Sequence, residues 1–256
     1  MSGSRFFLNT RVDDEKQGVN LTYVFQNPVP IDGGVFVPSR IQIFTKDNLE
    51  NIFNLSFQDL IICILKVYEE DFTNDIFSSL LKDVDKFEEI GYEYRFSDSS
   101  NFGLTIFQIA YHFWNYSNLV KNNTIPIWKD LVLVIPSENF ENGIAAFYAM
   151  QMGLPIKKIV FSFKEEDSNL NFFATGEYNI NSGKKLSSFD LERVLFHIFG
   201  KHRTTELMNY LESEGFFRLS YIELNKIKNY FDSYYLTQWL NLLNYNNYYS
   251  DFWYFI

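Results

Sequence analysis

The stretch 130–178 constrains the fold more than any other, because it predicts a strand, a loop, a helix and a second strand in direct succession. Residues 131–135 read LVLVI, an apolar run of strand length. Residues 143–152 predict a helix that Gly153 and Pro155 terminate, and residues 158–163 predict the next strand. Such a βαβ unit belongs to a parallel sheet, and the polar loop 136–142 brings a helix N-terminus to whatever ligand the fold holds.

Composition and charge exclude several classes of protein. The chain has 256 residues, of which 46% are hydrophobic and 19% aromatic, far too many for a disordered protein. The net charge is −10, and no Lys/Arg-rich block interrupts it, so neither a nucleic acid nor an anionic membrane is an expected partner. Cys63 is the one cysteine, residues 1–14 lack the pattern of a signal peptide, and the apolar runs are too short to span a membrane. The sequence therefore predicts a cytoplasmic globular protein.

Several motifs of this chain resemble the threonine synthases, which use pyridoxal phosphate. The loop 136–142 reads PSENFEN where that family has PSGNFGN, and it is followed by MGLPI at 152–156 and FFATGEY at 172–178. DGGVFVP at 32–38 is similar to the family's DGGLYVP. The segment 99–112 resembles an element best known from ε-proteobacterial threonine synthases, and residues 192–196 and 203–208 resemble the family's C-terminal region.

The resemblance implies a reduced form of the α/β architecture of fold type II pyridoxal-phosphate enzymes, with a parallel sheet at its core. It divides the chain into a small α+β region at 1–95, a remnant of the cofactor-binding domain at 96–185 and a helical C-terminal region at 186–256. Within the N-terminal region, Ser56 and Asp59 form a near-capping box that predicts a helix at 57–68.

The same resemblance points to a site in the loop, where the family binds the phosphate of its cofactor. Its remnant here would comprise Ser137, Asn139, Phe140 and Asn142. The family's two glycines, however, are replaced by Glu138 and Glu141. A carboxylate repels a phosphate dianion, and a side chain obstructs close approach of the backbone.

Two interpretations of the loop remain open. It can be an anion or cofactor site at a helix N-terminus, or Ser137, Asn139 and Glu141 can simply cap the helix, where acidic residues are favourable. The two glutamates favour the capping interpretation and make a small-molecule anion a doubtful ligand. A cation or an amine-bearing ligand is compatible with both.

The chain also lacks the part of the family sequence that carries the chemistry. No counterpart of HGPTxAFKD, whose lysine forms the Schiff base, or of the SGDTG loop stands between about residues 94 and 101, and TSPAMDI is absent near 184–187. That lysine anchors the cofactor and moves protons. Lys121 and Lys129 flank the segment before the loop, but both have the sequence context of ordinary solvated lysines.

The leading hypothesis is a threonine-synthase-like protein without catalysis, which acts through binding or through homo- or hetero-oligomer contacts. The alternatives are an active synthase or related lyase with a relocated lysine, converting O-phosphohomoserine to threonine and phosphate, and a small-molecule binding module. Aromatic residues are dense in 234–255, where ordinary core packing is the simpler interpretation. A cover over exposed apolar surface or a contact with a partner is the alternative.

The remaining candidate residues predict structural roles. His112, His197 and His202 lack the spacing of a zinc site, and Cys63 has no nucleophile context. The acidic stretch 165–167 has the pattern of a solvated loop. On these residues the sequence predicts no metal site.

Overall fold

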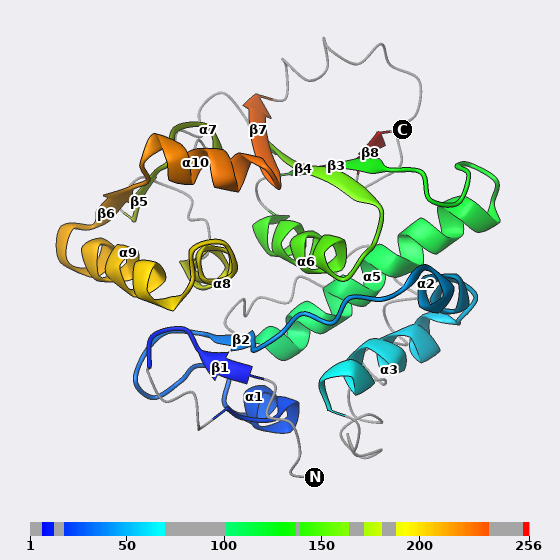
Figure 1. The fold of residues 1–256 in the computed structure, drawn as a ribbon, viewed down its shortest axis with the longest axis horizontal. Helices are drawn as coiled ribbons and strands as arrows, with labels where there is room; N and C mark the ends of the chain where they lie inside the picture. Colours follow the sequence, from blue (N-terminus) through cyan, green and yellow to red (C-terminus); the bar gives the residue numbers. More distant parts are fainter. Residues whose placement is uncertain are drawn as a thin grey trace. The chain divides into compact units, whose positions relative to one another are not determined.

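The computed structural model describes residues 7–12, 18–69, 101–136, 139–163, 172–180, 188–235 and 253–255. The chain divides into two compact units, one of Met1–Ile127 with Gln151–Leu154 and one of Trp128–Met150 with Pro155–Ile256 (Figure 1). The segment 102–121 thus belongs to the first unit. The division into regions 1–95, 96–185 and 186–256 is a sequence-based one and stays a prediction.

The first unit is built mainly from helices. Its elements are β1 (Phe7–Asn9), α1 (Leu21–Gln26), β2 (Phe36–Pro38), α2 (Lys46–Phe53), α3 (Phe57–Tyr68) and α5 (Phe102–Lys121). The predicted helix at 57–68 is confirmed, with the Ser56 hydroxyl accepting from the Asp59 backbone N–H at 3.1 Å. Glu69, which follows α3 directly, binds the N-terminal turn of α1, because its carboxylate accepts from the Thr22 backbone N–H at 2.8 Å.

A glycine turn precedes β2, the short strand that pairs antiparallel with β1. Gly33 and Gly34 have φ angles of +78° and +81°, a region that side chains other than glycine rarely adopt. The Asn9 amide donates to the Gly33 carbonyl at 3.1 Å, and the buried Thr10 hydroxyl accepts from the Val35 N–H at 3.0 Å. The side chains of Asn9 and Thr10 therefore fix the backbone of the turn through hydrogen bonds.

Aromatic side chains form the core of the first unit. The Phe7 ring lies 5.2 Å from that of Phe102 and 5.6 Å from that of Tyr68, and Phe53 lies 5.1 Å from Tyr116. These contacts join β1, α2 and α3 to α5, so the long helix α5 is the element around which this unit packs. Residues 70–100 lie outside the described residues.

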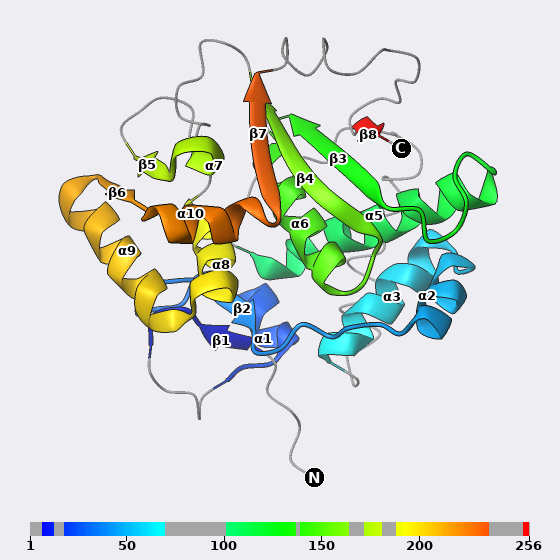
Figure 2. The same cartoon turned by 45° about the horizontal axis from the view of Figure 1, so that its top comes forward.

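The second unit contains the parallel sheet that the sequence predicts. Its strands are β3 (Leu131–Pro136), β4 (Ile156–Phe163), β7 (Phe231–Tyr235) and β8 (Trp253–Phe255), in the order β7-β4-β3-β8. β3, β4 and β7 are parallel, with Leu133 opposite Ile159 and Ile159 opposite Phe231, whereas β8 pairs antiparallel with β3. The α/β fold class is confirmed, and the arrowheads of the three parallel strands point the same way (Figure 2).

Helix α6 (Phe140–Gln151) covers one face of this sheet (Figures 1 and 2). It approaches β4 closely because Gly143 has no side chain: a Cβ built there would lie 2.2 Å from Cζ of Phe161. Phe161 stacks on Phe173 at 4.9 Å and 14°, and Phe173 stacks on Phe231 at 5.0 Å and 26°. The core between helix and sheet is thus a stack of phenylalanine rings.

The rest of the second unit comprises α7 (Phe172–Thr175), β5 (Glu177–Asn179), α8 (Ser188–Phe199), α9 (Lys201–Glu214), β6 (Phe216–Arg218) and α10 (Tyr221–Lys228). The region 186–256 was expected to be helical, and it does contain three helices. It also contains β6, β7 and β8, and β7 extends the central sheet. The aromatic residues 230–235 favour a strand over a helix, a signal that the prediction overlooked.

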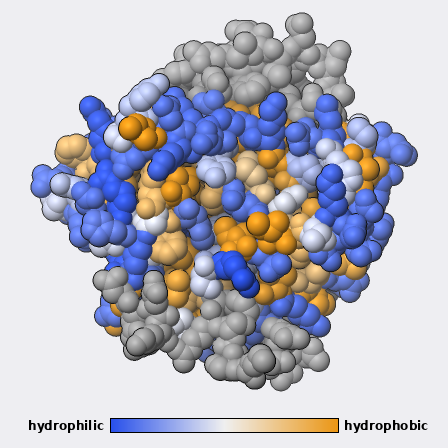
Figure 3. Space-filling model, in the orientation of Figure 1, coloured by the Kyte–Doolittle hydropathy of each residue, from blue (hydrophilic) through white to orange (hydrophobic). Residues whose placement is uncertain are grey.

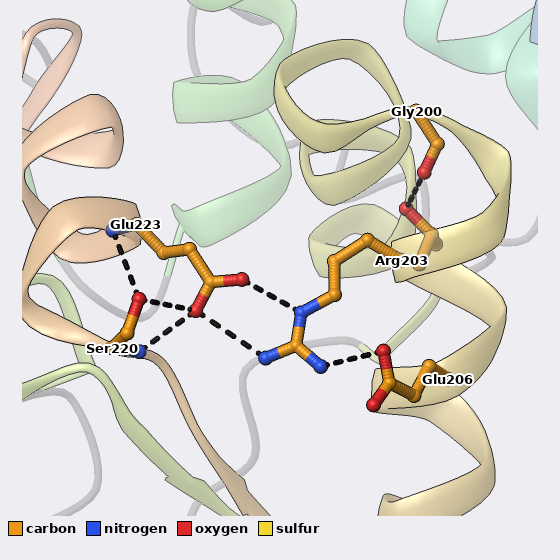
Figure 4. Close-up of polar contacts among 6 residues, drawn as sticks. Gly200, Arg203, Glu206, Ser220 and Glu223 are labelled. Atoms are coloured by element: carbon orange, nitrogen blue, oxygen red, sulfur yellow. Dashed lines mark hydrogen bonds and ion pairs between the residues drawn. The ribbon is translucent and has the colours of Figure 1, made fainter.

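Two helices of this unit are joined by an ion-pair network (Figure 4). The Arg203 guanidinium on α9 contacts Glu206 on the same helix and Glu223 on α10, each at 2.7 Å. Glu223 also accepts from the Ser220 N–H at 2.8 Å and completes the capping box of α10. Partial burial alone raises the pKa of Glu223, but the hydrogen bonds from Arg203 and Ser220 outweigh it and lower the pKa to about 2. This cluster therefore fixes α9 against α10.

Candidate functional site

The candidate site lies where the parallel strands of the second unit end. β3 ends at Pro136, β4 at Phe163 and β7 at Tyr235, and Pro136 is opposite Ser162 in the ladder. The carboxyl ends of parallel strands therefore share one edge of the sheet (Figure 2). Helix α6 begins directly after β3, so its N-terminal N–H groups lie at this edge. In open α/β sheets this is the edge at which ligands bind.

The structure places the predicted site residues in two different settings. Ser137 and Glu138 lie outside the described residues. Asn139 is half-buried in a short 3₁₀ turn before α6, and Asn142 is half-buried in the first turn of the helix. The helix begins at Phe140, three residues earlier than the sequence predicted, because Phe140 buries its ring against the sheet and extends the apolar face of α6.

Phe140 belongs to the core. Its ring is only 3% exposed and lies 5.1 Å from Phe161 and 5.9 Å from Phe173. The side chain thus packs between α6, β4 and α7. Any contribution of Phe140 to a ligand comes from its backbone N–H group, which has no partner inside the helix at this position.

Glu141 determines the electrostatics of the site. It occupies the first turn of α6, where the helix dipole provides about half a positive charge and a carboxylate is stabilised. Asn139 and Asn142 add amide groups that both donate and accept. The described part of the site thus combines amides with one carboxylate, a donor set that suits an amine, a hydroxyl group or a cation better than a phosphate dianion.

The lysines of the sheet lie at its other end. Lys158 is the third residue of β4, and its ammonium group donates to the Lys228 carbonyl, just before β7. Five residues separate it from the end of β4, a distance of about 16 Å along the strand. Lys129 precedes β3, and Lys226 lies in the last turn of α10. Among the described strands and the segments leading into them, every lysine is thus remote from the α6 N-terminus.

A hydrogen bond anchors α6 near its other end. His197 on α8 lies with Nε2 3.0 Å from the hydroxyl of Tyr148, which is fully buried. Burial of the imidazole and the positive charge of Arg193 lower the pKa of His197 to about 4, so this side chain is neutral at neutral pH. The sequence suggested a structural role for His197 but gave no sign of its partner, since the two residues are 49 positions apart.

Helix α8 also carries charged residues that the sequence did not single out as buried. Arg193 is fully buried and its guanidinium lies 2.7 Å from the Asp190 carboxylate, one turn earlier, while Glu192 is 1% exposed. On the same helix Leu191, Val194 and Leu195 are fully buried, whereas Ile198 and Phe199, which share their spacing, are half-buried. The i, i+3 spacing of Asp190 and Arg193 was the available signal for the ion pair.

Large apolar side chains are exposed on the second unit as well. Tyr210, Phe216, Tyr221 and Ile222 are between 46% and 79% exposed. Figure 3 shows apolar areas bordered by hydrophilic residues on the face that it draws. Among the described residues, no helix is long and apolar enough to cross a membrane, and no three His, Cys, Asp or Glu side chains are grouped to hold a metal ion.

Part of this chain matches known proteins in sequence. A family model described as threonine synthase N terminus matches residues 6–84. Threonine synthase-like 1 of Macaca fascicularis is 31% identical over 144 residues, which cover 52% of this chain and 19% of the relative. The chain thus spans about a fifth of the length of this curated relative.

Solved structures share the fold. The crystal structure of threonine synthase from yeast matches with a TM-score of 0.73 and 14% identity, over 91% of this chain and 76% of that one. A pyridoxal-phosphate-bound threonine synthase from Brucella melitensis matches with a TM-score of 0.68 and 13% identity, over 91% and 78% of the two chains.

The parallel sheet, its helix-terminus site and these structural neighbours define the class: an α/β protein of the fold type II pyridoxal-phosphate architecture. Within this class the chain is similar to the threonine synthases, through the family model over residues 6–84 and through the curated relative over about half of the chain. The resemblance carried by the motifs of the sequence is thereby supported, and the fold is confirmed.

Proposed function

We propose that this chain is a non-catalytic member of its family, a cytoplasmic binding or interaction protein that has lost pyridoxal-phosphate chemistry. The observation that carries the proposal is the carboxylate of Glu141 in the first turn of α6, at a position that resembles a phosphate-contacting glycine. Loss of the cofactor anchor and loss of the reactive lysine would each abolish the family reaction, and the chain combines indications of both.

The described residues do not fit the cofactor's phosphate. A carboxylate about 5 Å from a phosphate dianion costs roughly 2 kcal/mol even at the dielectric constant of water, and more in a partly buried site. Glu141 is half-buried, so solvent screens it only in part. The Asn139 and Asn142 amides supply hydrogen bonds but no positive charge to offset this repulsion.

The distribution of lysines supports the same proposal. A Schiff-base lysine must reach the cofactor that the helix terminus holds. Lys158 and the lysines preceding β3 and β7 lie at the opposite end of the strands. Lys164, Lys184 and Lys185 lie outside the described residues, and they are the positions at which a relocated lysine of the second unit would be sought.

The first test is an absorbance spectrum of the purified chain with excess pyridoxal phosphate, followed by borohydride reduction and peptide mapping. We expect no Schiff-base band and only scattered modification of exposed lysines. A band with one stoichiometrically modified lysine, together with release of phosphate from O-phosphohomoserine, would instead establish the active-synthase alternative and identify its catalytic residue.

A small-molecule binding module is the second candidate, favoured by the two amides and the carboxylate at the start of α6. Titration calorimetry with homoserine and with O-phosphohomoserine tests it, because the two ligands differ only by the phosphate. If the site takes an amine, homoserine binds at least as tightly as its phosphate ester. Tighter binding of the ester would contradict the electrostatic argument.

A further inference from the structure

The last described strand, β8, closes an edge of the central sheet. It pairs antiparallel with β3 through three residue pairs: Val132 with Phe255, Leu133 with Tyr254 and Val134 with Trp253. Without β8, β3 would present an apolar LVLVI run with unpaired backbone groups at this edge. β8 therefore completes the sheet at this edge through backbone pairing.

We propose that β8 is an exchangeable strand, and that the β3 edge takes either the β8 of its own chain or that of a second copy of this chain. The pairing is short: β8 contributes three residues, whereas β7 pairs with β4 through five. Short edge strands open locally at a low free-energy cost. β8 is therefore the strand of this sheet that leaves its position most readily.

The connection to β8 does not restrict it to its own chain. β7 and β8 lie at opposite edges of the sheet, three strand spacings or about 14 Å apart. The 17 residues 236–252 join them, and a chain of that length reaches roughly 55 Å when extended. The tether is thus long enough for β8 to reach the β3 edge of a neighbouring molecule.

Exchange preserves every backbone pair, because the same residues meet in the same register. The balance between the two arrangements is then set by protein concentration against the effective concentration of the tethered strand, which is on the order of millimolar for two segments of one chain. At ordinary concentrations most molecules hold their own β8. Covalent trapping can accumulate the exchanged form, which two copies build by symmetric strand swapping.

Disulfide trapping tests the proposal in the full chain, with Cys63→Ser as background. Val132→Cys and Phe255→Cys, made separately and mixed under oxidised glutathione, should give a cross-linked heterodimer whose yield rises about in proportion to concentration between 10 µM and 1 mM. The double variant Val132→Cys/Phe255→Cys should close within one chain at low concentration. Ile222→Cys, on a side chain that is 71% exposed, replaces Phe255→Cys to measure random collision.

Each outcome decides between the alternatives. Heterodimer above the Ile222→Cys background supports exchange. Intrachain closure of the double variant without heterodimer at any concentration overturns exchange while leaving the β3–β8 pairing intact. Failure of the double variant to close at all overturns both. A further variant, Tyr254→Pro in the Phe255→Cys chain, removes a backbone donor of β8 and should abolish the specific cross-link.

Discussion

Two turns of this chain resemble glycine-bearing motifs of the threonine synthases, and they differ in whether they contain those glycines. The turn just before β2 contains both, Gly33 and Gly34. The turn between β3 and α6 carries Glu138 and Glu141 where the resemblance places glycines, yet Gly143 follows directly. The two units of the molecule therefore each contain such a turn, one intact and one altered.

The geometry explains which glycines stay. A Cβ on Gly34 would lie 2.6 Å from Oδ1 of Asn9, and a Cβ on Gly143 would lie 2.2 Å from the Phe161 ring. These glycines are required by the fold itself, whatever the turn binds. Glu141, in contrast, stands in the first turn of α6 and is half-buried, so the fold accommodates a side chain at this position. Packing therefore accounts for the glycines at positions 34 and 143, and it does not require a glycine at position 141.

The strongest test of this comparison is Gly34→Ala. Its φ of +81° adds backbone strain for alanine, and the new Cβ collides with Asn9 and with the buried Thr10. Strain and overpacking together should lower the free energy of unfolding by about 3.5 kcal/mol. Gly33→Ala is the matched control, because its φ of +78° is similar but its nearest neighbour is 3.9 Å away. It should lose only about 1.5 kcal/mol.

Urea unfolding of both variants measures the difference. Equal losses for Gly33→Ala and Gly34→Ala would mean that backbone strain alone explains the retained glycines and that the contact with Asn9 and Thr10 contributes little.

A second test concerns the far end of α6, which His197 anchors through Tyr148. The pKa of His197 falls from 6.5 to about 4 on folding, mainly because the imidazole is buried and to a smaller extent because Arg193 is positively charged. As the pH falls through 6.5, His197 binds a proton in the unfolded chain but not in the native chain. The free energy of unfolding should therefore decline by about 3 kcal/mol between pH 6.5 and 4 because of this residue.

Unfolding curves at several pH values show whether this decline occurs. The variant Tyr148→Phe/His197→Phe removes both partners of the hydrogen bond and should lose this part of the pH dependence. The decline below pH 4.5 that comes from Glu223, whose pKa is about 2, should remain. An unchanged profile between pH 6.5 and 4 in the double variant would show that His197 is not the titrating group.

Substitution of Gly143, which packs against Phe161, should have a smaller effect on the free energy of unfolding. Gly143→Ala gains helix propensity but forces a buried ring to move, so we expect a net loss of about 1.5 kcal/mol. Phe161→Leu frees space at that point. In a double-mutant cycle, Gly143→Ala should therefore cost clearly less in the Phe161→Leu background, and strict additivity would contradict a direct clash.

The sequence predicted the βαβ unit well, since LVLVI at 131–135 and the Gly153–Pro155 stop are local signals. It placed the start of α6 three residues too late, because Phe140 was assigned to a ligand loop and its ring instead packs on Phe161. β7 and β8 were missed although aromatic residues favour strands. Which strands they pair with is set by partners far away in the chain, and that part the sequence alone does not reveal.

The site itself was predicted only where the resemblance supplied a motif. Asn139 and Asn142 do lie at the α6 N-terminus, but the Tyr148–His197 anchor carries no motif. This contact joins two helices whose separation in sequence gives no periodic signal, whereas the Asp190–Arg193 pair lies within α8 and only its i, i+3 spacing indicated it. The lysines of the sheet could be placed at its remote end only once the strand directions were known.

The smallest effect on stability, and the sharpest on binding, belongs to Glu141. Glu141→Gln removes its charge, and Glu141→Gly also frees the backbone; each should change the free energy of unfolding by less than about 1 kcal/mol. If the carboxylate is what excludes phosphate, calorimetric affinity for inorganic phosphate should rise about tenfold in Glu141→Gln, and further in Glu141→Gly. Glu50→Gln, an exposed charge on α2, is the control for net charge. Equal phosphate affinity in all four proteins would break the link between the lost glycine and the lost ligand.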